Sequence, residues 1–186
     1  IHSEMPKQTE GRMRGFQVWL NLPAHSKMQA PDYRDIPSAS IPEYAGATVS
    51  GKLIAGRAQL DGALLEGLVS RPDTEPVYLD LHFDKASDAH TIEVTDGATT
   101  LIYVYEGEIA LGEQGSRVQR GKLARLSRDG SRIDLRTLAD NTRVVLLAGQ
   151  PLNEPIVQYG PFVMNTRQEI EQALDDYRRG VLAQTF

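Results

Sequence analysis

Apolar and polar residues alternate with a period of two along most of the chain after Thr48. The clearest run is 77–83, in which the odd positions are apolar and the even positions are polar or aromatic. This alternation predicts a β-strand with one buried face. Further strands are predicted at 49–54, 90–94, 99–105, 107–111, 122–126, 131–135 and 143–148. Gly, Asp and Asn occupy many of the gaps, so we expect an all-β fold, an antiparallel sheet that is closed or sandwiched.

One α-helix is predicted after these strands. The run Thr166-Arg167-Gln168-Glu169 fits a capping box, in which the first and last side chains each bond the backbone N–H of the other. Ile170, Leu174 and Tyr177 then recur at helical spacing, and Gly180 can end the helix in the left-handed conformation.

The first 47 residues have a different pattern. Residues 1–22 are typical of two extended pieces, and the second piece, 16–22, alternates apolar and polar residues around Trp19, which we expect in a core. Residues 23–47 are rich in proline, serine, alanine and aspartate. This stretch is interpreted as a long irregular connection between two packed units.

The composition excludes several classes of function. Of the 186 residues, 40% are hydrophobic and 24% charged, as in ordinary globular proteins. The net charge of -5 and the absence of a basic stripe argue against direct nucleic-acid binding. No apolar run approaches the roughly 18 residues of a membrane span. Because there is no cysteine, disulfides, thiolate metal sites and a cysteine nucleophile are excluded. No targeting segment is visible, and we expect a cytoplasmic protein.

His2 and Glu4 are the strongest candidates for chemistry. Residues two apart on a strand point to the same face, so this imidazole and carboxylate would converge on one point. Such ligands suit iron, manganese, nickel or zinc. A His-x-Glu spacing is common by chance, however, and gains meaning only from its flanking residues.

Four stretches of the chain resemble the pirin family, in the family's order. They are Ile1-His2-Ser3-Glu4-Met5-Pro6, then Gly15-Phe16-Gln17-Val18-Trp19-Leu20-Asn21-Leu22-Pro23, then Leu147-Ala148-Gly149-Gln150-Pro151-Leu152-Asn153-Glu154-Pro155, and finally Gln158-Tyr159-Gly160-Pro161-Phe162-Val163-Met164-Asn165-Thr166. The last stretch is the most specific, and the resemblance extends to about residue 180.

The resemblance implies a bicupin, a chain with two RmlC-like antiparallel β-barrels. In this family the N-terminal barrel holds a mononuclear non-haem iron through a His-x-His pair and a His-x-Glu pair. His2 and Glu4 match the second pair, so the remaining ligands are expected upstream of residue 1. The chain is then expected to lack most of the N-terminal barrel.

The domain organisation predicted from this resemblance has four parts. These are the terminal strands of the metal barrel at 1–22, an interdomain linker at 23–47, the C-terminal cupin domain at 48–165, and a C-terminal helix and tail at 166–186.

The resemblance also implies an activity, cleavage of a flavonol such as quercetin by O₂ at Fe(II), with manganese, nickel or zinc as other candidate metals. Glu4 would be both a ligand and the catalytic group that accepts the hydroxyl proton of the substrate. Two ligands alone hold a ferrous ion poorly, so the chain by itself is expected to be inactive. The alternative is an iron-dependent regulatory protein that binds transcription factors or metabolic enzymes.

The remaining candidates have ordinary structural interpretations. His82 lacks the cupin metal pattern, since residues 80 and 84 are both aspartate, and His90 is interpreted as a surface or hydrogen-bonded histidine. Gln17 is an alternative outer partner of a metal ligand. The run 162–165 is interpreted as packing, with the mouth of a metal pocket as the alternative.

Overall fold

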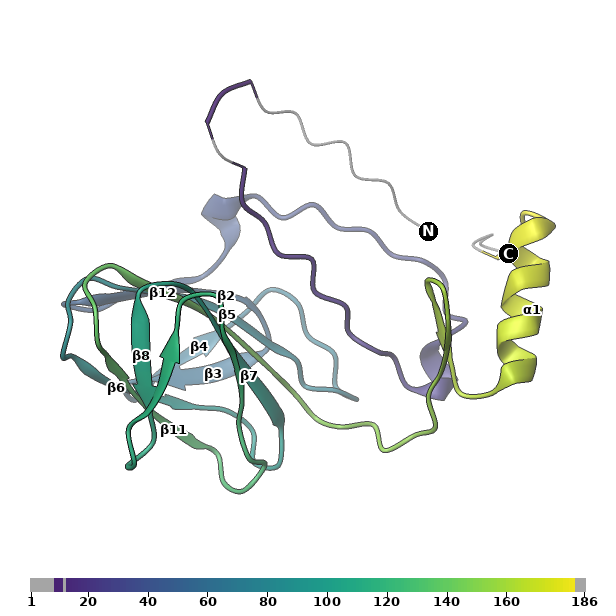
Figure 1. Cartoon of the computed structure of the whole chain (residues 1–186). Helices are drawn as coiled ribbons and strands as arrows, with labels where there is room; N and C mark the ends of the chain where they lie inside the picture. The colour runs from purple at the N-terminus through teal and green to yellow at the C-terminus, as the bar shows by residue number, and fades with distance from the viewer. Residues whose placement is uncertain (1–8, 12, 183–186) are drawn as a thin grey trace. The chain divides into compact units, whose positions relative to one another are not determined.

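The structure is a computed structural model that describes residues 9–11 and 13–182 (Figure 1). The chain divides into two compact units. One, here named the barrel unit, is Asp35–Leu152. The other, here named the terminal unit, combines the described residues up to Arg34 with those from Asn153 onward.

The barrel unit consists of two six-stranded antiparallel sheets. In spatial order the first contains β1 (Glu43–Ala45), β2 (Val49–Ala55), β5 (Val77–Phe83), β12 (Thr142–Gly149), β7 (Thr99–Glu106) and β10 (Leu123–Arg125). The second contains β4 (Ala63–Glu66), β3 (Arg57–Leu60), β6 (Ala89–Glu93), β11 (Arg132–Thr137), β8 (Glu108–Leu111) and β9 (Ser116–Gln119). The inner faces of both sheets contribute to a single hydrophobic cluster, so the sheets pack face to face (Figure 1).

The core follows directly from the period-two pattern. Along β5 the burial alternates strictly, with Val77, Leu79, Leu81 and Phe83 inside. The largest fully buried side chains are aliphatic apart from one phenylalanine: Phe83, Leu53, Leu60, Leu79, Leu81, Ile92, Ile102, Ile109, Leu135, Leu146, Val104 and Val144. Removing such surface from water is the main term that stabilises a sandwich of this kind.

Glycines allow the chain to pass from one sheet to the other. Gly56 joins β2 to β3 and Gly107 joins β7 to β8, and both have a positive φ, 81° and 74°. A Cβ at Gly56 would lie 1.8 Å from the carbonyl oxygen of Pro76, and one at Gly107 would lie 2.2 Å from Oγ1 of Thr142. Both corners therefore need glycine for its conformation and for its small size.

The predicted fold class is confirmed as a mostly β sandwich with one C-terminal helix, and all eight predicted strands are present to within one or two residues at most ends. Six short strands, however, were not predicted. They have three or four residues each, too few to establish a period. They are β1, β3, β4, β9, β13 (Val157–Tyr159) and β14 (Phe162–Met164).

The predicted helix is also confirmed, as α1 (Arg167–Arg178) in the terminal unit. Thr166 and Glu169 form the capping box in both directions. At the other end Gly180 has φ 72°, and its N–H and that of Val181 bond the carbonyls of Tyr177 and Asp176. This is the Schellman arrangement that satisfies the last carbonyls of a helix.

The terminal unit has its own small apolar cluster. Met164 of β14 packs with Ile170 and Ala173 of α1, and four half-buried side chains border them. The ring of Phe162 also meets the ring of Tyr177 edge to face, with centroids 6.3 Å apart. The run 162–164 thus packs on the helix that follows it.

Residues 13–23 have no regular secondary structure, and Trp19 is 61% exposed. The expectation of Trp19 in a core is therefore wrong for this structure. A strand needs a neighbouring strand, and the two six-stranded sheets begin only at Glu43. Two short 3₁₀ helices, η1 (Ala24–Ser26) and η2 (Ser38–Ser40), follow this segment.

None of the helices in residues 9–11 and 13–182 combines the length and the hydropathy that a membrane crossing requires.

Candidate functional site

The predicted metal pair, His2 and Glu4, lies outside the described residues, so its role stays a prediction. Within the residues that the structure describes, no group of three or more His, Cys, Asp or Glu side chains is arranged to hold a metal ion. Among the described residues of the barrel unit, polar side chains form one group around His90 and another on the outer face of the first sheet.

His82 lies on the outward face of β5, where the alternation predicted it. Its Nε2 is 3.8 Å from a carboxylate oxygen of Asp84, which is too long for a hydrogen bond. The residues on either side of His82 in the strand, Leu81 and Phe83, point inward and are fully buried. His82 is thus a half-exposed side chain on the outer surface of the sheet.

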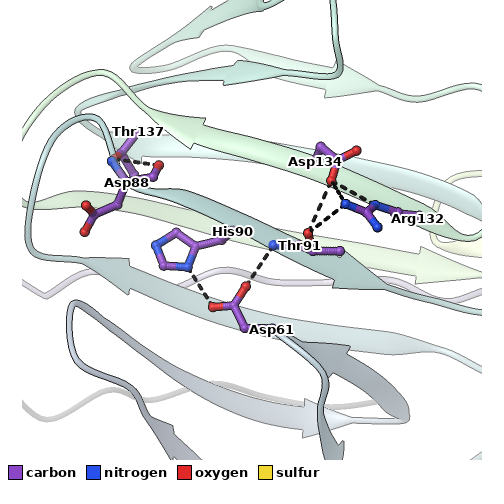
Figure 2. Close-up of polar contacts among 7 residues, drawn as sticks. All are labelled: Asp61, Asp88, His90, Thr91, Arg132, Asp134 and Thr137. Carbon is purple, nitrogen blue, oxygen red and sulfur yellow. Dashed lines mark hydrogen bonds and ion pairs between the residues drawn. The ribbon is translucent and has the colours of Figure 1, made fainter.

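His90 occupies the opposite kind of position, on the inner face of β6 with only 7% of its side chain exposed. Its Nδ1 is 2.8 Å from Oδ2 of Asp61, and the other carboxylate oxygen accepts a hydrogen bond from the backbone N–H of Thr91 at 2.9 Å (Figure 2). The His90 ring also packs against Phe83, with centroids 4.9 Å apart. Asp61 therefore orients the imidazole and fastens the β3–β4 hairpin to β6.

Asp61 can do this because of the turn in which it lies. Asp61 and Gly62 connect β3 to β4, and both have positive φ, 49° and 82°. A two-residue hairpin with two positive φ angles strongly favours Asp-Gly. The Asp-Gly dipeptide is the sequence signal from which β3, β4 and their turn could have been predicted. No residue spacing indicates that Asp61 contacts His90, which is 29 residues away.

The Asp61–His90 pair has the geometry of a carboxylate that holds an imidazole in one tautomer. With Nδ1–H donating to Asp61, Nε2 keeps its lone pair. Nε2 is buried, however, and has no hydrogen-bond partner among the described residues. The interpretation of His90 as a hydrogen-bonded histidine is confirmed, and the pair supports a structural role at the end of the barrel.

Two polar groups flank this pair in Figure 2. On the outer side, the guanidinium of Arg132 bonds Asp134, which accepts from the hydroxyl of Thr91 at 3.2 Å. Towards the loop before β6, the Thr137 hydroxyl accepts from the N–H of Asp88 and donates to a carbonyl. The Arg132–Asp134 pair is exposed and adds little stability.

The outer face of the first sheet carries a second polar cluster. The hydroxyl of Tyr105 donates to Asp80 at 2.7 Å, and burial, followed by this hydrogen bond, raises the pKa of Tyr105 well above its usual value. Nε of Arg143 lies 3.4 Å from Glu106. Tyr105 is accordingly a hydrogen-bond donor that keeps its proton, which suits binding or packing rather than proton transfer.

Residues 78–183 match the family model for the pirin C-terminal cupin domain. The chain belongs to the pirin family. The matched range contains most of the barrel unit, including His82, His90 and Tyr105.

Individual pirins and related proteins agree with this assignment. A Pseudomonas aeruginosa protein named "Putative quercetin 2,3-dioxygenase" is 53% identical and matches 98% of this chain and 64% of its own length. A "Pirin-like protein" of Caulobacter vibrioides is 39% identical, over 97% of this chain and 63% of its own. The crystal structure of a quercetin 2,3-dioxygenase from Acinetobacter baumannii superposes with a TM-score of 0.78 and 36% identity, over 90% of this chain and 56% of that one.

The chain thus spans less than two thirds of the length of each of these relatives.

Proposed function

We propose that this pirin, in its complete form, is a mononuclear non-haem iron dioxygenase that cleaves a flavonol such as quercetin with O₂. The observation that carries the proposal is the 53% identity, along nearly the whole chain, to a relative named for this activity. The His-x-Glu pair at His2 and Glu4 supports it, because imidazole and carboxylate ligands with open positions are typical of O₂ chemistry at Fe(II).

In this proposal His2 and Glu4 are two of the metal ligands, and the others come from a part of the protein upstream of residue 1. The iron, when bound, supplies the site at which O₂ and the flavonol react. Glu4 also takes the proton of the flavonol hydroxyl, the role of a general base that lies within hydrogen-bond reach of that hydroxyl. Manganese, nickel or zinc are alternative metals, since these ligands bind several divalent ions.

The proposed organisation assigns residues 1–22 to the metal barrel, 23–47 to the linker, 48–165 to the second cupin domain and 166–186 to the C-terminal helix and tail. A cytoplasmic location belongs to the same proposal.

The test is oxygen uptake by the full-length, iron-loaded protein with quercetin. We expect uptake in the wild type and its loss in Glu4→Ala, together with reduced iron content in His2→Ala. A rate in the wild type no higher than that of Glu4→Ala would rule out the dioxygenase. A loss of uptake without any change of iron content in His2→Ala would rule out His2 as a ligand.

A regulatory role is the second candidate. The "Pirin-like protein" relative carries a name that specifies no reaction, and a net charge of -5 suits contacts with proteins better than with nucleic acid. A pull-down that compares the reduced and the oxidised iron form tests it. A partner that binds one form only is expected, and an empty partner set in both forms would exclude regulation.

A further inference from the structure

Glu154 connects two distant parts of the terminal unit. Its Oε2 accepts a hydrogen bond from the backbone N–H of Ala24 at 2.8 Å, although the two residues are 130 positions apart. The same oxygen accepts a second hydrogen bond from Nδ2 of Asn165 at 2.9 Å. Asn165 also donates to the carbonyl of Pro155. We name this set of contacts the Glu154 clasp.

The N–H of Ala24 is one that needs such a partner. Ala24 opens the 3₁₀ turn η1, and the first N–H groups of a helical turn have no partner inside it. Pro23, just before it, is buried and has no N–H to offer. A hydrogen bond from a backbone N–H to a carboxylate is roughly twice as strong as one between neutral groups.

Lys27 closes the loop in which Ala24 lies, and its charge acts on Glu169 of α1. Its ammonium donates to Oδ1 of Asn21 at 2.6 Å, which closes the 21–27 loop. Hydrogen bonds from Thr166 lower the pKa of Glu169 most, and the charge of Lys27 lowers it further. Lys27 thus lies close enough to the start of α1 to interact electrostatically with it.

The clasp joins residues from two of the four stretches that resemble pirins to the residue that directly follows a third. Ala24 directly follows the second stretch, Glu154 belongs to the third, and Asn165 to the fourth. The family model for the C-terminal cupin domain runs to residue 183, whereas the compact units separate after Leu152. The hairpin β13–β14 and α1 therefore follow the barrel in sequence but pack with the N-terminal segment.

We infer that Glu154 is a positioning residue that fastens the C-terminal hairpin and helix to the segment following His2 and Glu4, so that residues 153–182 stabilise the metal-bearing part of the protein and not the barrel unit. The link to metal rests on the proposed function. The clasp itself rests only on the described residues.

The first test is hydrogen exchange followed by mass spectrometry on the full-length protein. In Glu154→Ala we expect peptides that cover 20–28 and 153–182 to exchange on the order of tenfold faster or more, because a charged hydrogen bond is lost. Peptides of the barrel, over 77–149, should keep their wild-type rates. Glu171→Ala is the matched control, since Glu171 is exposed on α1 and the change in the side chain is identical.

Unchanged exchange in Glu154→Ala, or equal acceleration in the barrel peptides, would overturn the inference. Glu154→Gln is the second variant in case the alanine variant does not fold. Its amide oxygen still accepts a hydrogen bond, so it should restore part of the protection in 20–28.

The second measurement is the rate at which the iron-loaded protein loses iron to a chelator. We expect Glu154→Ala to lose iron several-fold faster, Glu154→Gln to be intermediate, and Glu171→Ala to match the wild type. If exchange accelerates while iron loss does not, the assignment of residues 153–182 to the metal-bearing part is wrong. If the wild type binds no iron at all, the dioxygenase proposal fails and the exchange result still decides the clasp.

Discussion

The barrel unit and the terminal unit are stabilised in different ways. The barrel buries a continuous cluster of large aliphatic side chains from two six-stranded sheets. The apolar cluster found among the described residues of the terminal unit has three buried members, Met164, Ile170 and Ala173. Individual polar contacts, such as the Glu154 clasp and the capping box, add to it.

Because of this difference, we expect substitutions to affect the stability of the two units differently. Because many buried contacts stabilise the barrel, we expect only a change that disturbs the backbone path or opens a large cavity to unfold it. In the terminal unit fewer buried side chains contribute, so we expect the loss of a single one to have a larger effect on its stability. Free energies of opening commonly differ between regions of one protein, and here we expect the terminal unit to open first.

Gly56→Ala should have the largest effect, in the barrel unit. The added Cβ would lie 1.8 Å from the carbonyl oxygen of Pro76, and φ is 81°. We expect a loss of more than about 4 kcal/mol in the free energy of unfolding, measured with urea. Gly112→Ala is the control, because φ is 66° there but nothing lies within 4 Å, so its loss should be only about 1 to 2 kcal/mol. Equal losses in the two variants would show that the sheet corner tolerates a side chain.

Ile170→Ala should come next, in the terminal unit. It removes one of the three buried apolar side chains of that cluster, at a cost of about 2 to 5 kcal/mol. We expect proteolysis to cut within 153–182 much faster while the urea transition of the barrel stays in place. Ile156→Ala, at a side chain that is 69% exposed, should change neither. A shift of the barrel transition with Ile170→Ala would mean that the two units unfold as one.

Asp61→Ala tests a polar contact that does stabilise the barrel. It leaves His90 Nδ1 and the N–H of Thr91 without their carboxylate, and we expect a loss of about 1 to 3 kcal/mol in urea unfolding. Asp61→Asn keeps an oxygen acceptor and tolerates the positive φ, so its loss should be smaller. If the alanine variant were as stable as the wild type, the orientation of His90 would contribute nothing.

The smallest expected effect is a loss of thermal stability of the terminal unit at acid pH. Hydrogen bonds from Thr166 hold the pKa of Glu169 below its usual value of 4.5. A carboxyl whose pKa is lowered on folding stabilises the native state above its unfolded pKa, and this stabilisation is lost as the pH falls through the folded pKa. Thermal loss of helix signal at 222 nm should therefore move to lower temperature between pH 6 and pH 3.

Glu169→Gln should show a smaller shift over the same pH range, and Glu171→Gln should behave as the wild type does. Identical pH profiles in Glu169→Gln and the wild type would show that the ionised capping box does not stabilise α1.

Much of the fold could be predicted because its signals are local. Alternation along 77–83 determines which face of β5 is buried, and the capping box and Gly180 determine where α1 begins and ends. The predicted site is a different case. His2 and Glu4 were identified by their pairing and by the pirin-like residues around them, and their convergence on a metal stays a prediction. Short strands such as β3 and β4 could not be predicted from alternation, because four residues do not establish a period.

The sequence by itself thus determined most of the longer strands, the helix with its caps and the family. Only the tertiary structure decided which distant groups contact each other. Asp61 bonds His90 across 29 positions, and Glu154 bonds Ala24 across 130. The carbonyl of Pro76 lies where a side chain at residue 56 would be. The physical reason is that burial along a strand depends on neighbours one or two residues away. A contact between distant segments depends instead on the register of every strand between them, and on the turn or corner that sets each register.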